Sequence, residues 1–223
     1  MPAAQPVPAD QTLDEIRLLL APAIADAAVF DGWSKAAVAM AAREKGIDLR
    51  IAALAFPGGP MDLIAAWIAS VDAAMEAEFT DGALTDQPIR ERIRRLVTFR
   101  LDKLAGRDEA LRRALAIMAM PQNAPRALRL GWESADAMWY LAGDTATDYN
   151  HYTKRTLLAG IYAATLAVYA QDQSEGKAET RAFLDRRIAG VMRFEKTKAQ
   201  LLRPDVERFS VSRLLGRLRY PPR

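Results

Sequence analysis

The feature that most constrains this chain is its helical periodicity. Apolar residues recur every three or four positions, and no segment alternates apolar and polar residues as a strand would. Capping residues, glycines and prolines divide the pattern into nine segments and a shorter tenth. The predicted helices are 11–29, 35–45, 48–56, 61–79, 86–104, 107–120, 123–142, 150–171 and 177–202, with a tenth that begins at Ser210. The sequence therefore predicts an all-α bundle of about nine helices plus a C-terminal amphipathic helix.

Composition narrows the class of protein further. The 223 residues suit one domain, with or without a terminal appendage, and 51% of them are hydrophobic, which is enough for a large core. The sequence has no cysteine, which excludes disulfides, thiolate zinc sites and cysteine nucleophiles and is compatible with a reducing compartment. Residues 1–10 are rich in alanine and proline and have no cation, so we expect a disordered lead-in and not a signal or transit peptide. The longest uncharged run, 156–171, is shorter than the roughly 20 residues of a membrane-spanning helix.

The first four predicted helices follow the order found in TetR-type regulators, whose second and third helices form a helix-turn-helix. A regulator of this type needs side chains on the third helix that reach phosphates and base edges. Here that helix is aliphatic and has Arg50 as its only cation. The pattern therefore predicts a TetR-like fold that does not bind nucleic acid. A TetR-like, ligand-sensing transcriptional regulator remains the alternative function.

The sequence offers few residues for catalysis or metal binding. His151 is the only histidine, and it lies near Asp144 and Asp148, an arrangement that could support a general base. No serine or cysteine nucleophile has local support, however, and one histidine makes a poor metal cluster. A di-metal site in a helical bundle would need Glu-x-x-His pairs, which the sequence lacks. We therefore expect no catalytic residue, no metal and no cofactor.

The predicted helix 150–171 is unusual because its apolar residues cover more than one face. Such a helix is buried on all sides, lines a cavity or packs against a second subunit. Gly160, Ala163 and Ala164 lie among its bulky residues and leave room for a close helix or for a ligand. The pattern alone does not choose among core, cavity and dimer interface.

The segment from Ser134 to Arg155 carries a resemblance to a known family. It reads S-A-D-x-M-W-x-x-A-G-D-x-x-T-D-x-N-x-Y-T-K-R, and this wording resembles the COQ9 family, the ninth Coq protein, a lipid-binding accessory factor of ubiquinone biosynthesis. The resemblance implies a TetR-like homodimer without catalytic activity. Such a protein would hold an isoprenoid quinone precursor and present it to the di-iron demethoxyubiquinone hydroxylase. The residues that we expect to contact lipid are Trp132, Met138, Trp139, Leu158, Ile161 and Tyr162.

The resemblance also implies a surface that binds the hydroxylase. In the family this surface lies around the turn after the Gly-Asp pair of the motif. Carried over by position, the expected contacts are Asp148, Tyr149, Asn150, His151 and Tyr152. The family usually has a tryptophan where this chain has His151, so this chain departs from the family pattern at that contact.

The C-terminal segment 204–223 has an independent amphipathic pattern. From Arg203 to Arg223 the sequence has six arginines and two carboxylates, which give a net charge of +4, while the rest of the chain is about neutral. Ser210 can cap the tenth helix, and Phe209 and Leu214 have the spacing of a hydrophobic staple. A helix this short needs a surface to fold against, which is either an anionic membrane or the protein itself. The resemblance favours the membrane, and the expected contacts are Phe209, Val211, Leu214, Leu215, Leu218, Arg213, Arg217 and Arg219.

These expectations divide the chain into four parts. The lead-in 1–10 precedes a helix-turn-helix-like subdomain over 11–60, a helical bundle for lipid binding and dimerisation over 61–203, and a basic amphipathic tail for membrane contact over 204–223. Together they predict a cytoplasmic protein that lies peripherally on the inner membrane.

Overall fold

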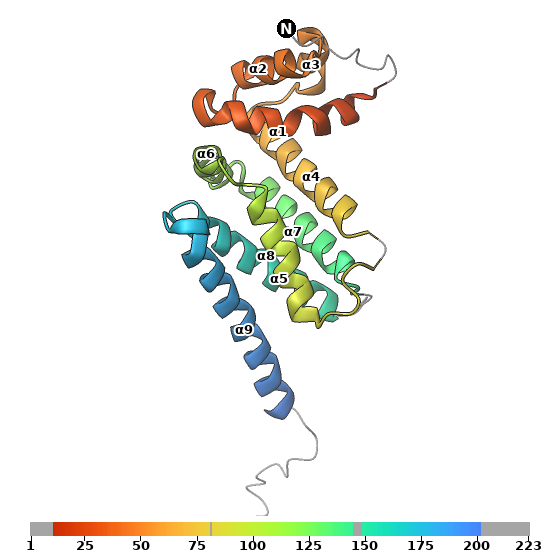
Figure 1. Ribbon diagram of the computed structural model, residues 1–223, viewed down its shortest axis with the longest axis vertical. Coiled ribbons are helices and arrows are strands. Elements are labelled where there is room, and N and C mark those ends of the chain that lie inside the picture. The colour runs from red at the N-terminus through yellow and green to blue at the C-terminus, as the bar shows by residue number, and fades with distance from the viewer. Residues whose placement is uncertain (1–10, 81, 145–148, 202–223) are drawn as a thin grey trace, which may run out of the picture. The chain divides into compact units, whose positions relative to one another are not determined.

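The computed structural model describes residues 11–80, 82–144 and 149–201, although not the side chains of residues 149, 150 and 191–201. Over these residues the protein is helical and contains no strand, which confirms the all-α prediction (Figure 1). The elements are α1 (Leu13–Asp31), α2 (Lys35–Lys45), α3 (Leu49–Ala55), α4 (Pro60–Glu78), α5 (Ile89–Asp102), α6 (Asp108–Met118), α7 (Ala124–Leu141), α8 (Tyr149–Tyr169), a short 3₁₀ turn (Glu175–Lys177) and α9 (Ala178–Leu201). The predicted tenth helix lies outside the described residues.

The chain divides into two compact units, residues 1–185 and 186–223. Helices α1 to α8 belong to the first unit, and α9 begins in the first unit and ends in the second. The helix-turn-helix-like helices and the following bundle are thus parts of one compact unit. The four-part division of the chain stays a prediction.

Side-chain caps mark the starts of the first three helices. Ser34 accepts a hydrogen bond from the backbone N–H of Ala37, and Asp48 accepts one from Arg50, as expected for N-caps. Helix α1 is capped by Thr12 in a capping box with Glu15. At the start of α7, the backbone of Asn123 is already helical, and its side-chain amide donates to the carbonyl of Ile117 at 2.8 Å.

Helices α1, α2 and α3 pack on one another through small side chains. Ala21, Ala25 and Ala28 of α1 and Ala37 and Ala42 of α2 are fully buried. Because a methyl group occupies little space, the backbones of these helices can approach closely. The core of this three-helix unit therefore combines these alanines with a few large side chains, of which Leu20 and Ile24 are fully buried.

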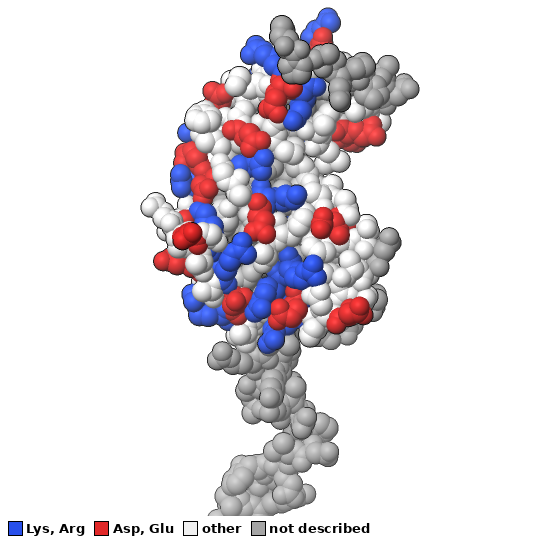
Figure 2. Space-filling model, viewed as in Figure 1, with Lys and Arg blue, Asp and Glu red and all other residues white. Residues whose placement is uncertain are grey.

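The exposed face of α3 is aliphatic, although it corresponds to the recognition helix of a regulator. Leu49, Ile51 and Leu54 are exposed, and Leu54 is 66% exposed. The single cation of this helix, Arg50, forms an ion pair with Asp48 at 3.4 Å. On the face shown in Figure 2, basic side chains are interspersed with acidic ones and do not form a continuous basic surface. The structure agrees with the sequence in giving α3 little that could contact a phosphate backbone.

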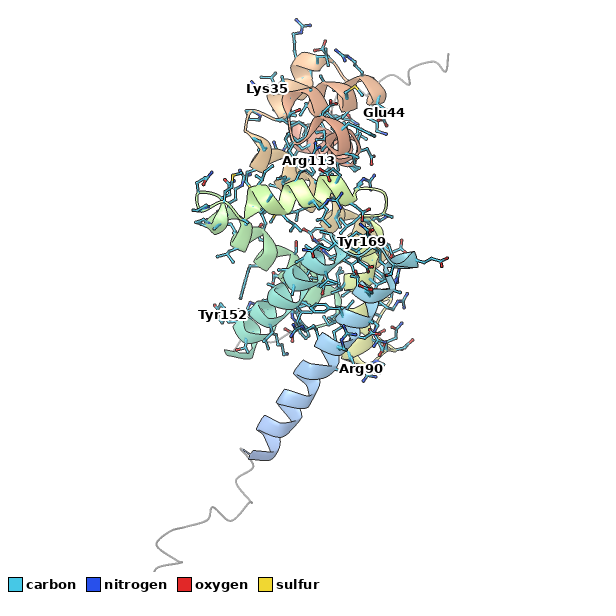
Figure 3. The ribbon with its side chains drawn as sticks, turned by 90° about the vertical axis from the view of Figure 1, so that its left-hand side faces the viewer. Lys35, Glu44, Arg90, Arg113, Tyr152 and Tyr169 are labelled. Atoms are coloured by element: carbon cyan, nitrogen blue, oxygen red, sulfur yellow. The ribbon has the colours of Figure 1, made fainter. Side chains whose placement is uncertain are left out.

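Helix α4 connects this unit to the bundle, since it packs against α1 at one end and against α5, α6 and α7 along its length. Asp62, near its start, accepts hydrogen bonds from Arg17 of α1 at 2.8 Å and from Arg126 of α7 at 3.2 Å. Arg113 of α6 donates to the carbonyl oxygens of Ala28 and Phe30 at the C-terminal end of α1 (Figure 3). Polar contacts therefore join the two regions at several points.

The described residues contain no single helix that is both long and apolar enough to cross a membrane. Helices α3 and α4 together would satisfy the length and composition of a span, but they are bent by 88° at the break between them.

Candidate functional site

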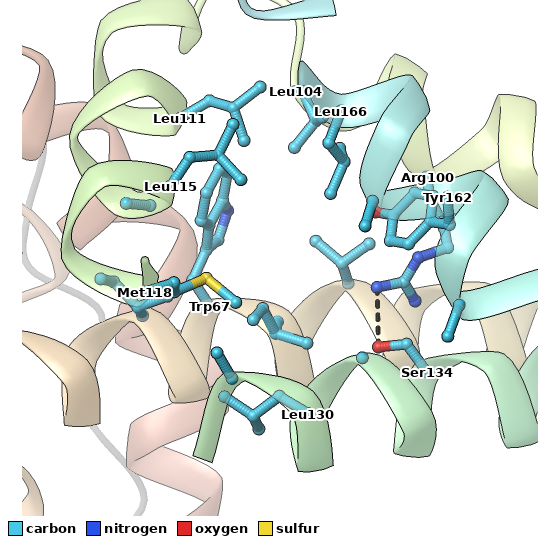
Figure 4. A pocket seen from close by; sticks show the side chains of 18 of the residues that line it. Trp67, Arg100, Leu104, Leu111, Leu115, Met118, Leu130, Ser134, Tyr162 and Leu166 are labelled. Carbon is cyan, nitrogen blue, oxygen red and sulfur yellow. Dashed lines mark hydrogen bonds between the residues drawn. The ribbon is translucent and has the colours of Figure 1, made fainter. Parts of the chain in front are cut away.

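The bundle formed by α4 to α8 encloses a cavity of about 220 Å³ (Figure 4). Its inner wall comes from α4, α5 and α6 and from the residues that follow α5. The side chains of this wall are buried and almost all apolar; they include Ile64, Trp67, Val71, Leu104, Leu111 and Ala114. Trp67 is held in place by Trp33, whose ring centroid lies 5.2 Å away. This wall is thus an apolar surface.

The other side of the cavity is more exposed and forms its mouth. Leu115 and Met118 of α6, Leu128 and Gly131 of α7, and Leu166 of α8 lie there. Leu128 is 76% exposed, which is high for a leucine beside a cavity. A Cβ atom at Gly131 would meet no other atom within 4 Å, so the glycine leaves open space. Apolar surface therefore continues from the cavity to the outside of the protein.

One end of the cavity is polar. Figure 4 shows Arg100, Ser134 and Tyr162 together at this end, opposite Met118 and Leu115. Arg100 is 2% exposed and forms an ion pair with Asp72; its Nη2 donates to the Ser134 hydroxyl at 3.0 Å. The Ser134 hydroxyl donates in turn to Asp72 at 3.1 Å, and the Tyr162 ring centroid lies 4.9 Å from the Arg100 guanidinium carbon. Burial of such charges is tolerated because they are paired.

Of the six residues predicted to contact lipid, Tyr162 lines this cavity and the other five do not. Met138 and Leu158 are buried, while Ile161 is half-buried. The indole N–H of Trp139 donates to the backbone carbonyl of Lys154 at 3.0 Å, so this aromatic side chain joins α7 to α8. Trp132 stacks on Tyr152 with ring centroids 6.0 Å apart. The role of these five residues in lipid binding stays a prediction, and the cavity is lined by other residues.

Sequence reasoning missed the contribution of α4, α5 and α6 to the cavity. In the sequence, Trp67, Leu104 and Leu111 look like ordinary core residues, because periodicity shows which face is buried but not whether that face meets a neighbour. A better signal was Arg100, a cation at a position that the helical pattern of α5 places inside. A buried charge in an apolar region indicates a special environment.

The charged residues of the Ser134–Arg155 motif hold the junction between α7 and α8. Arg155, almost fully buried, forms ion pairs with Asp136 and with Asp144, the latter at 3.1 Å, and Lys154 reaches Asp144 at 2.7 Å. Gly143 has a φ of +83°, a backbone conformation that residues other than glycine rarely adopt. These residues hold the turn between α7 and α8 in shape, so several residues of the motif have a structural role.

Two of the five predicted partner contacts are described in full. Tyr152 is 62% exposed at the start of α8 and projects from the outside of the protein (Figure 3). Its ring is supported by Trp132 and lies edge-on to His151, with centroids 5.1 Å apart. Asp148 lies outside the described residues, as do the side chains of Tyr149 and Asn150 and all eight predicted membrane contacts. In the part of the chain that the structure describes, no three His, Asp or Glu residues are grouped to hold a metal ion.

Comparisons with known proteins give a consistent result. The family model described as COQ9 matches residues 124–195, which include α7, α8 and the turn between them. The protein "Ubiquinone biosynthesis protein COQ9, mitochondrial" of Rattus norvegicus is 33% identical over 177 residues, covering 76% of this chain and 56% of the rat protein. Its Homo sapiens counterpart is 39% identical over 117 residues, covering 52% of this chain and 36% of the human protein. This chain spans about half the length of the curated relatives from Rattus norvegicus and Bos taurus that it matches.

A solved structure shows the same fold. The TetR transcriptional regulator from Nitrosomonas europaea ATCC 19718 superposes with a TM-score of 0.62 and covers 79% of this chain and 98% of its own. The two sequences are 22% identical, so the likeness concerns the fold alone. It confirms the TetR-like architecture predicted from the order of the helices.

Proposed function

Because this chain belongs to the COQ9 family, we propose that it is a non-catalytic, lipid-binding accessory protein of ubiquinone biosynthesis. In this proposal the protein binds isoprenoid quinone intermediates at the membrane and presents them to the demethoxyubiquinone hydroxylase as a homodimer. The observation that carries the proposal is the apolar cavity between α4 and α8, with its apolar mouth at Leu128.

The physical need for such a protein follows from the ligand. A polyprenylated ring is nearly insoluble in water, and each Å² of apolar surface removed from water contributes about 25 cal/mol. A cavity with buried leucine, isoleucine and tryptophan side chains gives this surface a dry environment. An accessory protein needs no catalytic group for this task, because binding and handover are sufficient.

The proposed contact with the hydroxylase is the surface formed by Trp132, His151 and Tyr152. Exposed aromatic side chains are enriched at protein interfaces because they bury a large area at a small cost in side-chain entropy. Tyr152 is also held in place by Trp132, which lowers that cost further. The buried ion pairs of Arg155 fix the start of α8, from which Tyr152 projects.

The proposed contact with the membrane is the tail 204–223, on the sequence pattern alone. Deletion of residues 209–223 should reduce flotation of the protein with vesicles that contain anionic lipid, since each arginine near such a surface contributes about 1 kcal/mol. Flotation should also fall as salt rises, because screening weakens the contact. A truncated protein that floats as well as the full chain would remove the tail from the proposal.

The experiment that tests lipid binding is mass spectrometry of organic extracts from the purified full chain. We expect isoprenoid quinones or their precursors at close to one per protein. Gly131→Leu, which fills the open space in the cavity, provides the matched sample and should carry much less lipid. Phospholipid alone would leave a lipid-binding protein of another specificity, and equal lipid in the two samples would place the lipid elsewhere.

The alternative function, a ligand-sensing regulator, shares the fold and the cavity. It is disfavoured by α3, whose exposed side chains Leu49, Ile51 and Leu54 cannot donate hydrogen bonds to base edges. A protein without bound lipid that retards duplex DNA in a gel would reverse this preference.

A further inference from the structure

The polar end of the cavity calls for an explanation that lipid binding alone does not give. A cavity that only enclosed an apolar chain would be more stable without charges, because a buried ion pair is often no better than apolar residues of the same volume. Here Arg100, Asp72 and Ser134 are nevertheless grouped at one end, with Tyr162 beside them. Charge at this position is therefore a candidate for ligand recognition.

The guanidinium group of Arg100 has more donors than the side chains around it use. It carries five N–H groups, of which one on Nη1 donates to Asp72 and one on Nη2 donates to Ser134. Arg100 and Ser134 both belong to the lining of the cavity. A ligand oxygen that enters this end can therefore accept a further hydrogen bond from the guanidinium group.

The charges at this end also restrict the ligand. The positive charge of Arg100 is balanced by Asp72, which leaves the cluster neutral as a whole. A phosphate or carboxylate would bring an uncompensated negative charge into a site whose lining is almost all apolar, at a high desolvation cost. A carbonyl or ether oxygen accepts a hydrogen bond without that cost. The cluster thus suits a neutral head group that accepts hydrogen bonds.

The size of the cavity indicates which part of the ligand it encloses. Pockets that hold a whole small ligand measure about 300–1,000 Å³, and this cavity is about 220 Å³. A long polyprenyl lipid cannot lie inside it completely. The end opposite Arg100 is apolar and leads to the exposed Leu128, where a chain could leave the protein.

We propose that the cavity binds its lipid head first, with a neutral, oxygen-bearing ring at Arg100 and Tyr162 and the apolar chain leaving between α6, α7 and α8. This inference rests on the proposed function and adds to it an orientation and a recognition residue. It also implies that the ring is shielded from water until the protein releases it.

The test compares ligands that share a tail and differ in the head. A decyl-substituted dimethoxy-methyl-benzoquinone, decylbenzene and decyl phosphate are each titrated against the full chain, and bound ligand per protein is measured by mass spectrometry after gel filtration. We expect the benzoquinone to bind roughly tenfold more tightly than decylbenzene, as for one hydrogen bond from a charged donor. Decyl phosphate should bind more weakly than the benzoquinone.

Two variants remove the recognition while they keep the cavity. Arg100→Lys retains a cation beside Asp72 but lacks the planar group of five donors, and the double variant Arg100→Met with Asp72→Leu replaces the ion pair by apolar groups. Both should lose the roughly tenfold preference for the benzoquinone and still bind decylbenzene as before. Ser70→Ala, which removes a hydroxyl from α4 outside the lining, is the control and should change neither.

The outcomes separate this inference from the proposed function. Equal binding of the benzoquinone and decylbenzene by the unmodified protein would overturn the head-first orientation and leave lipid binding intact. A preference that survives in both variants would overturn the role of Arg100, and tighter binding of decyl phosphate would overturn the neutral head group. A protein that binds none of the three would refute lipid binding in this cavity and the inference with it.

Discussion

Two regions of the first compact unit, helices α1 to α3 and helices α4 to α8, are packed differently. Helices α1 and α2 bury a cluster of alanines together with Leu20 and Ile24, whereas α4 to α8 surround an apolar cavity. In a DNA-binding regulator, the first region reads DNA and the second senses a ligand. In this chain the first region keeps its shape without a basic α3, and the second keeps a cavity with a polar end. The two regions of one fold therefore differ in what their side chains offer to a ligand.

The comparison predicts that the same substitution has different costs in the two regions. Ala25→Leu in α1 should destabilise the protein by about 3 kcal/mol, because no free volume surrounds a fully buried alanine. Ala114→Leu in α6 should cost much less, since this alanine lines the cavity and the added carbons can enter it. Urea denaturation of both variants measures the difference, and equal costs would show that the cavity has no usable space.

Asp62 should report on the junction of the two regions. Hydrogen bonds from Arg17, and then from Arg126, hold the pKa of Asp62 below its usual value in spite of partial burial. A lowered pKa in the folded state contributes stability that is present above the unfolded value of about 4 and is lost as the pH falls below it. Asp62→Asn should destabilise the protein by about 2 kcal/mol at neutral pH and make its stability less sensitive to acid.

The measurement for Asp62 is thermal unfolding of the two proteins between neutral pH and about pH 3. Their stabilities should converge as the pH falls, because acid removes the carboxylate that the substitution has already removed. A constant difference across this range would show that Asp62 does not join α1 to the bundle through its charge.

Two glycines offer a matched pair for the cavity. Gly131 lies in α7 and lines the cavity, whereas Gly160 lies in α8 outside the lining; a Cβ atom at either position meets no atom within 4 Å. Leucine at either position should stabilise its helix by roughly 0.5–1 kcal/mol, because glycine is a poor helix former. Only Gly131→Leu should reduce lipid in the organic extract. A similar loss from both variants would mean that the loss does not come from filling the cavity.

The smallest effect on stability is expected at the exposed aromatic surface. Tyr152→Ala removes a side chain that is supported by Trp132 but is largely in solvent, so the free energy of unfolding should change by less than about 0.5 kcal/mol. Binding to the hydroxylase should weaken clearly, while bound lipid should stay the same. Tyr140→Ala, at another exposed tyrosine on α7, is the control. Lost lipid with intact partner binding would contradict the assignment of this surface.

The sequence predicts the helices well because their signals are local. Ser34, the alanine-rich segment and Gly46 place α2 at Lys35–Lys45, which is where the structure has it. The position and lining of the cavity are not predicted, because the space between α4, α6 and α8 depends on how far apart three distant segments pack. Trp132 and Trp139 look like ligand contacts in the sequence, yet one supports Tyr152 and the other joins α7 to α8. The sequence shows where an aromatic side chain stands in the chain, but not which residue it packs against.

The small volume of the cavity and its open mouth at Leu128 determine whether the protein can select lipids by tail length. A site that encloses only one end of a polyprenyl lipid does not contact the far end of the tail, so it cannot distinguish lipids by their number of isoprene units. If the ring is the enclosed end, quinones with short and long tails present the same surface to the protein. Tail length would then be fixed wholly by the enzyme that builds the chain, and one accessory protein could serve a mixed pool without adjustment.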